Sequence, residues 1–196
     1  AATAAPPAPK EIATLPPLPV LRQDVPLSER TGEPPRPLSV LVGLVLFCLA
    51  AAAVTGVYAR HWWLAVFPTT YPSSAHLVQW AAPDPGKWLS LTLEGVLALV
   101  LVLVAGACAV AGYQAWIGWN WARIISITAL GLTGVAVLLF DLWALVAVGL
   151  ALLGTVCVFL PDTTRYFRYF EAHRARLEET YRTPERIFYG RLPRFR

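Results

Sequence analysis

The stretch WLSLTLEGVLALVLVLVAGACAVAG, residues 88–112, decides the fold class of this chain. Its 25 residues carry one formal charge, which belongs to Glu94. A helix needs about 20 apolar residues to cross the hydrocarbon core of a bilayer, and this stretch is long enough. It therefore predicts a transmembrane helix that has a single carboxylate inside it.

Three further apolar runs are long enough to span a bilayer, and they cover residues 38–58, 122–140 and 142–160. The last two runs are separated only around Asp141. One helix made of both would be about 58 Å long, which is too long for one bilayer. A tight hairpin is therefore expected at Asp141, although no Gly or Pro is there to make the turn. The predicted fold is all-α, a four-helix transmembrane bundle.

The composition of the whole chain agrees with a membrane protein. Of its 196 residues, 57% are apolar and 14% are charged, whereas soluble domains have about 45–50% apolar and about 25% charged residues. The three cysteines, at positions 48, 108 and 157, all lie in apolar runs and form no CxxC motif. Neither a disulfide scaffold nor a zinc site is predicted.

Two polar segments flank the predicted domain of residues 38–160. Residues 1–37 hold ten of the 17 prolines, which predicts an extended proline-rich arm. Residues 161–196 form a basic tail, in which Asp162 is the predicted N-cap of an amphipathic helix. Apolar and aromatic side chains recur there on one helical face, namely Tyr166, Phe170, His173, Leu177 and Tyr181.

The basic residues predict the orientation in the membrane. Four spanning helices place both termini on one side, together with 14 of the 16 Lys and Arg residues. Only Arg60 and Lys87 fall on the other side. The positive-inside rule then places both termini in the cytoplasm, and the expected location is the inner (plasma) membrane. Residues 59–87 are expected to form the outer loop.

Glu94 is the candidate functional residue inside the membrane. It lies about 10 Å along its helix from Lys87, on a face of small side chains that favours contact with another helix. An intramembrane carboxylate can relay protons or bind a cation. The alternative is a structural Glu94 that stays protonated or hydrogen-bonds a Ser, Thr or Trp of a neighbouring helix. This alternative is favoured, because no further carboxylate, Lys or His is expected inside a span.

The histidines predict neither a haem nor a metal site. His61 and His76 are assigned to the outer loop and His173 to the tail, so the bundle lacks axial histidine pairs. Motifs for disulfide exchange, for a catalytic triad and for phosphate-binding loops are also missing from the sequence. No catalytic residue, cofactor or metal ligand is predicted, and the chain is not expected to be an enzyme. The basic tail is expected to contact lipid or protein rather than nucleic acid.

The stretch GYQAWIGWNWAR, residues 112–123, joins the second and third predicted helices. Its tryptophans suit a membrane interface, Gly118 allows a turn, and Arg123 supplies inside charge. The loop looks like that of many small four-helix membrane proteins of actinobacteria. The proline-rich arm, four-helix body and basic aromatic tail together resemble the proline-rich supercomplex-associated factor of the actinobacterial cytochrome bcc–cytochrome oxidase supercomplex. This resemblance in layout and composition implies an accessory subunit without a redox centre.

Two functions are open on these grounds. The leading expectation is a non-catalytic accessory subunit of a larger membrane complex, a respiratory-chain supercomplex by the resemblance, with unlike membrane subunits and phospholipid as partners. Its partner-binding residues are expected in the arm, where apolar side chains alternate with prolines, namely Leu15, Pro16, Pro17, Leu18, Pro19 and Val20. The alternative is a small homo-oligomeric transporter or channel that uses Glu94.

Overall fold

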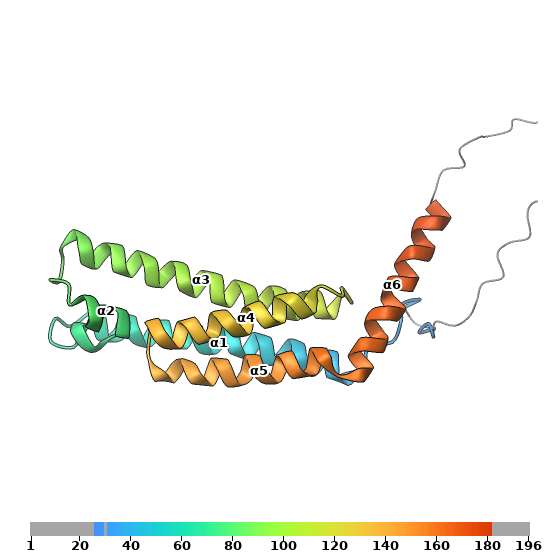
Figure 1. Cartoon of the computed structure of the whole chain (residues 1–196), viewed down its shortest axis with the longest axis horizontal. Coiled ribbons are helices and arrows are strands. Elements are labelled where there is room, and N and C mark those ends of the chain that lie inside the picture. Colours follow the sequence, from blue (N-terminus) through green and yellow to red (C-terminus); the bar gives the residue numbers. More distant parts are fainter. Residues whose placement is uncertain (1–25, 30, 182–196) are drawn as a thin grey trace, which may run out of the picture.

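The computed structural model describes residues 26–29 and 31–181, with side chains described as far as Ala175. Within these ranges every regular element is helical. The four long apolar helices are α1 (Leu38–Ala65), α3 (Trp88–Trp116), α4 (Ala122–Leu139) and α5 (Leu145–Phe159), and they run up and down along one axis (Figure 1). Helix α6 (Pro161–Tyr181) leaves one end of this bundle at an angle. The predicted partner-binding residues 15–20 lie outside the described residues.

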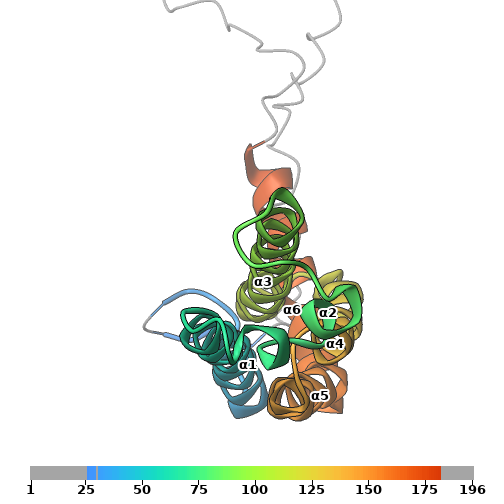
Figure 2. The same cartoon turned by 90° about the vertical axis from the view of Figure 1, so that its left-hand side faces the viewer.

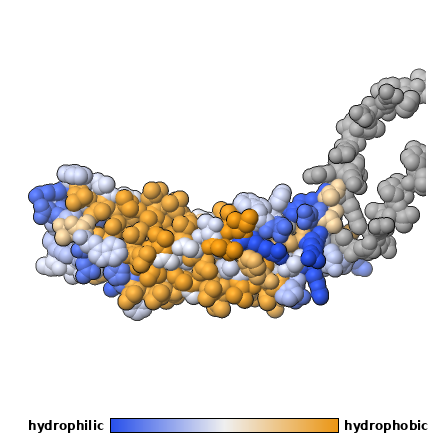
Figure 3. Space-filling model, viewed as in Figure 1, coloured by the Kyte–Doolittle hydropathy of each residue, from blue (hydrophilic) through white to orange (hydrophobic). Residues whose placement is uncertain are grey.

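The four long helices form a ring. Helix α1 packs against α3 and α5, and α4 packs against the same two helices, so α1 and α4 lie across the bundle from each other (Figure 2). All four are long and apolar enough to cross a membrane, α5 together with the short 3-10 turn η2 (Leu142–Ala144) before it. A broad apolar band covers the middle of the face in Figure 3, and polar residues gather at both ends. The chain is therefore a multi-pass membrane protein.

Small residues allow these helices to pack closely. Phe47 of α1 is fully buried where α1 meets α3 and α5. A Cβ added to Gly154 of α5 would lie 3.2 Å from the Phe47 ring, and one added to Gly112 of α3 would lie 3.0 Å from Leu44. The hydrophobic effect contributes little to helix association within lipid, so close van der Waals contact of this kind stabilises the bundle.

The hairpin predicted at Asp141 is confirmed. Helix α4 ends at Leu139, and Asp141 is extended. Its carboxylate accepts a hydrogen bond from the backbone N–H of Leu142 at 2.6 Å, which caps the 3-10 turn η2. A side-chain cap thus makes the reversal that neither Gly nor Pro provides.

The prediction that residues 59–87 form a loop is wrong in part. Helix α1 continues to Ala65, and the remaining segment contains the 3-10 turn η1 (Tyr71–Ser73) and the short helix α2 (His76–Ala81). The reason is that polar residues in the last turns of α1 have partners on other elements. Arg60 pairs with Asp141, and His61 bonds to Glu94, so the helix continues beyond the apolar run.

Helix α6 begins at Pro161, so Asp162 lies in its first turn and the predicted N-cap is wrong. Proline is favoured at the first helical position, because its missing N–H would have no intrahelical partner there. Of the predicted apolar face, Tyr166 and Phe170 are buried, together with Phe167. The side chains of Leu177 and Tyr181 lie outside the described residues.

Side chains of α6 hold the loop between α3 and α4. The Tyr166 hydroxyl donates to the carbonyl oxygen of Trp116 at 2.6 Å, and Arg174 donates to that of Gly118 at 2.7 Å. The Arg174 guanidinium lies 4.0 Å from the ring centroid of Trp119. Gly118 has a φ of +72°, and a Cβ on it would lie 2.7 Å from Phe170. The turn predicted at Gly118 is confirmed, and only glycine fits there.

Candidate functional site

Glu94 contacts another helix, as predicted, but its partner is His61. Nε2 of His61 in α1 and Oε2 of Glu94 in α3 share a hydrogen bond of 2.8 Å. The His61 side chain is 1% exposed and that of Glu94 is 20% exposed. His61 lies in α1, near the end of one of the four candidate spans, so the prediction that places it in the outer loop is wrong. The expected Ser, Thr or Trp partner is also wrong.

Aromatic rings hold the imidazole of His61 in place. The ring centroid of Tyr58 lies 6.0 Å from that of His61, and the ring centroid of Phe140, at the end of α4, lies 6.4 Å away in an edge-on arrangement. The second ring nitrogen, Nδ1, is buried and has no hydrogen-bond partner. Packing between rings therefore fixes the imidazole with only its Nε2 engaged, and that nitrogen is bonded to Glu94.

An open hollow of about 180 Å³ lies beside this pair. It is lined by the end of α1, the segment through η1, the loop before α3 and the first turns of α3, with Trp62, Ala65, Pro68, Tyr71, Pro85, Gly86, Ser90, Leu91 and Glu94. Two of its polar atoms, the Tyr71 hydroxyl and Glu94 Oε1, are buried without a partner. The hollow is thus mostly apolar and has two free hydrogen-bonding groups.

Tyr71 keeps its proton over a wide pH range. Burial raises the pKa of the Tyr71 phenol above its ordinary value of 10.0, and the negative charge of Glu94 raises this pKa further. The nearby Ser90 hydroxyl lowers it by less, since Ser90 donates its own hydrogen to the carbonyl oxygen of Lys87 at 2.8 Å. The protonated phenol can therefore donate a hydrogen bond into the hollow.

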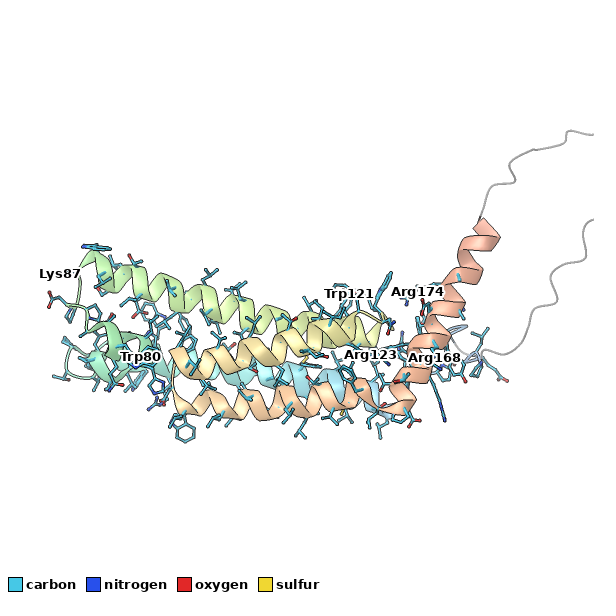
Figure 4. The ribbon with its side chains drawn as sticks, in the orientation of Figure 1. Trp80, Lys87, Trp121, Arg123, Arg168 and Arg174 are labelled. Carbon is cyan, nitrogen blue, oxygen red and sulfur yellow. The ribbon has the colours of Figure 1, made fainter. Side chains whose placement is uncertain are left out.

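Glu94 differs from the other charged groups around it. Arg60 pairs with Asp141, and Lys87, at the outer tip of this end in Figure 4, pairs with Asp84. Among the described residues, no Lys or Arg forms an ion pair with Glu94, and no group of three His, Cys, Asp or Glu side chains could hold a metal ion. The Glu94 carboxylate can therefore accept a proton.

Beyond this site the core of the bundle is filled by packed side chains. Leu97, Val104 and Cys108 follow Glu94 along the buried face of α3. The buried hydroxyls farther along bond to backbone carbonyls: Thr133 to that of Leu130, Ser126 to that of Arg123, and Thr155 to those of Ala151 and Ser126. Within the described part of the chain, no chain of polar side chains links Glu94 to the opposite end of the bundle.

Sequence reasoning missed His61 and Tyr71 as members of this site. A signal for His61 exists, because the buried residues of α1 recur at steps of three and four and the same spacing reaches position 61, namely Val40, Gly43, Phe47, Ala50, Val54, Val57 and His61. Tyr71 reaches the site through the turn η1, and no periodic pattern marks it.

Comparison with known protein families, with curated proteins and with solved structures finds no match to this chain. Its function must therefore be inferred from the chemistry of the Glu94 site and from the construction of the two ends of the bundle.

Proposed function

We propose that this chain is a non-catalytic accessory subunit of a larger membrane complex. The observation that supports this role is the joint between α6 and the α3–α4 loop, where Tyr166 bonds to the carbonyl of Trp116 at the end of α3, Arg174 bonds to that of Gly118 in the loop, and Phe170 packs on Gly118. These contacts fix a helix that projects beyond the apolar band. A preordered surface loses little conformational entropy when a partner docks.

The closed interior of the bundle supports the same proposal. A transporter made of one copy needs polar groups along a path, whereas the few buried hydroxyls in the described core beyond Glu94 bond to backbone carbonyls and form no such path. The resemblance in layout extends the proposal to the identity of the host, a respiratory-chain supercomplex. Residues 15–20 of the arm would then dock on that host. The chain would act by holding subunits together, without a redox centre of its own.

The proposal includes an orientation, with both termini in the cytoplasm and the α2 end outside. It rests on the 14 of 16 basic residues that this arrangement keeps inside. Ser73 is exposed in η1, so a Ser73→Cys variant should react with a membrane-impermeant maleimide in intact cells. Protection of that cysteine, together with labelling of a Thr3→Cys variant, would reverse the orientation.

Composition of the native complex tests the accessory role. The full chain, tagged and solubilised in mild detergent, should appear in native mass spectrometry together with unlike chains at a fixed ratio. Gly118→Val should lower that ratio by displacing α6, whereas Gly131→Ala, at an exposed helical position with open space around it, should not. Recovery of copies of this chain alone would contradict the accessory role.

The His61–Glu94 pair favours a second candidate, a homo-oligomeric transporter or channel. A carboxylate and an imidazole at 2.8 Å can share and pass on a proton, and several copies could supply a path that one copy lacks. Proteoliposomes with a pH-sensitive dye inside would detect this activity. Flux that is lost in Glu94→Gln and kept in Asp84→Asn, a carboxylate at the same end, would favour this candidate over the accessory role.

A further inference from the structure

A second pocket lies at the other end of the bundle, between the start of α4 and the helix α6. It has a volume of about 220 Å³ and is lined by Asn120, Arg123, Thr164, Phe167, Arg168 and Glu171. Figure 4 shows Arg123 and Arg168 together at this joint, with Trp121 close by. The pocket shares no residue with the hollow at Glu94.

Arg123 is firmly positioned in this pocket. Its Nη2 donates to the Thr164 hydroxyl oxygen at 2.7 Å, and that hydroxyl donates to the carbonyl oxygen of Leu160 at 3.1 Å. The guanidinium carbon lies 5.7 Å from the ring centroid of Phe159 and 5.6 Å from that of Phe167. Packing and one hydrogen bond thus hold the guanidinium in a single place, which leaves most of its N–H groups free for a ligand.

The charge of Arg123 has no counter-ion among the described residues. The four ion pairs found there are Arg36–Glu33, Arg60–Asp141, His61–Glu94 and Lys87–Asp84. Arg123 Nε is also buried without a partner. A partly buried guanidinium is costly when it is unpaired, and its planar fork matches the oxygens of a phosphate group. Arg168 and the amide of Asn120 add donors to the same pocket.

The surroundings of the pocket indicate what the phosphate is attached to. Arg123 lies in the first turn of a candidate span, and Trp119 and Trp121 beside it are exposed, as is typical of the level of lipid headgroups. From Phe159, against the Arg123 guanidinium, exposed apolar side chains continue along α5 at helical spacing, namely Val156, Leu152, Leu153, Leu145 and Val146. This face is suited to an acyl chain.

We propose that the pocket binds the phosphate of an anionic phospholipid, with Arg123 and Arg168 on the phosphate oxygens and an acyl chain along α5. Basic pockets beside membrane spans are suited to such headgroups. Glu171 also lines the pocket, and its negative charge repels an anion, so it lowers the affinity of the pocket for the lipid phosphate. The site does not depend on the accessory role.

Native mass spectrometry of the full chain tests this site. Phosphatidylglycerol and phosphatidylcholine with identical acyl chains are added to the protein in neutral detergent, and the retained lipid is counted. Phosphatidylglycerol should be preferred by the unmodified chain. Arg123→Gln should lower its retention about tenfold or more and Arg168→Gln several-fold, because each loses charge-assisted bonds to phosphate. Glu171→Gln should raise the retention.

Arg165→Gln is the matched control, since Arg165 is an exposed arginine one turn earlier on α6 and does not line this pocket. It should change phosphatidylglycerol retention by less than about twofold. A loss equal to that of Arg168→Gln would show general surface attraction and overturn the site. Displacement of the lipid by equimolar inorganic phosphate would show a site for free phosphate and would overturn the lipid assignment. Arg168 is exposed, so Arg168→Gln should fold and still test the contribution of the pocket to lipid binding even if Arg123→Gln fails to fold.

Discussion

Polar side chains have different hydrogen-bond partners at the two ends of the bundle. At the α6 end, Tyr166 and Arg174 bond to backbone carbonyls at the end of α3 and in the α3–α4 loop. At the α2 end, Arg60 and His61 bond to carboxylates instead. Three of the five buried polar atoms without a partner in the described residues, His61 Nδ1, Tyr71 Oη and Glu94 Oε1, belong to this one site. The joint between α6 and the α3–α4 loop is thus built for fixed geometry, with the Arg123 pocket beside it, whereas the α2 end holds most of the unpartnered polar atoms.

This comparison predicts that substitutions in the contact between α6 and the α3–α4 loop act mainly on structure. The largest effect is expected from Gly118→Val, because Gly118 has a φ of +72° and its missing Cβ leaves room for the Phe170 ring. Strain and overpacking together should destabilise the contact between α6 and the loop by about 2–4 kcal/mol. Hydrogen exchange should show α6 amides losing protection while those of α3 keep theirs.

Gly131→Ala is the control for this experiment, since a Cβ at Gly131 meets nothing within 4 Å. It should leave the exchange of α6 unchanged and stabilise α4 by less than about 1 kcal/mol, as alanine is the better helix former. Equal protection of α6 in the Gly118→Val and Gly131→Ala proteins would show that the joint is not held by this contact.

Much of the fold follows from local sequence, and the outcome at α3 shows why. An apolar run of bilayer length forms a helix in lipid because every backbone group must be hydrogen-bonded internally. The prediction for residues 88–112 accordingly differs from α3 only by the four residues to Trp116. The α4–α5 hairpin was predicted for a similar reason, since no single helix of that length fits one bilayer.

The contents of the site were less predictable, because they depend on residues far apart in sequence. Glu94 was found because a lone charge in an apolar run is conspicuous. His61 was misplaced because Arg60 and two tryptophans beside it are typical of a loop at the membrane surface, whereas partners 33 and 81 residues away keep this segment helical. The contact between Gly118 and Phe170 likewise depends on where α6 docks, which no local pattern specifies.

The next effect in size is expected at Glu94. Glu94→Leu leaves the nearly fully buried His61 Nε2 without its hydrogen-bond partner, which should cost about 1–3 kcal/mol of unfolding free energy. Glu94→Gln keeps an acceptor of the same shape and should change that free energy by less than about 1 kcal/mol. Denaturant unfolding in detergent micelles, followed by tryptophan fluorescence, measures both. Similar losses in the two variants would show that the charge of Glu94, not its hydrogen bond, stabilises this end.

A smaller difference should separate the two members of the Arg60–Asp141 pair. Both side chains are partly exposed, so Arg60→Gln should cost less than about 1 kcal/mol. Asp141→Ala should cost about 1 kcal/mol more, because it also removes the cap on the Leu142 N–H. The same unfolding experiment gives both values. A cost for Arg60→Gln that matches or exceeds that of Asp141→Ala would mean that the ion pair, and not the cap, holds the hairpin.

The smallest effect is expected in the titration of Tyr71, one of the buried polar groups without a partner at the α2 end. Burial and the charge of Glu94 raise the pKa of Tyr71 above 10.0, so the phenol holds its proton longer in the folded chain than in the unfolded one. Above this ordinary value the unfolded state loses the proton first, and stability should fall as the pH rises toward the folded pKa. The absorbance of tyrosinate measures this titration, and the difference between the unmodified chain and Tyr71→Phe isolates the contribution of Tyr71. The matched control is Tyr113→Phe, because Tyr113 is exposed.

Glu94→Gln should lower the pKa of Tyr71 by removing the neighbouring charge, and Asp84→Asn should not. A Tyr71 titration unchanged by Glu94→Gln would mean that burial alone sets it and that Glu94 carries no charge in the folded protein.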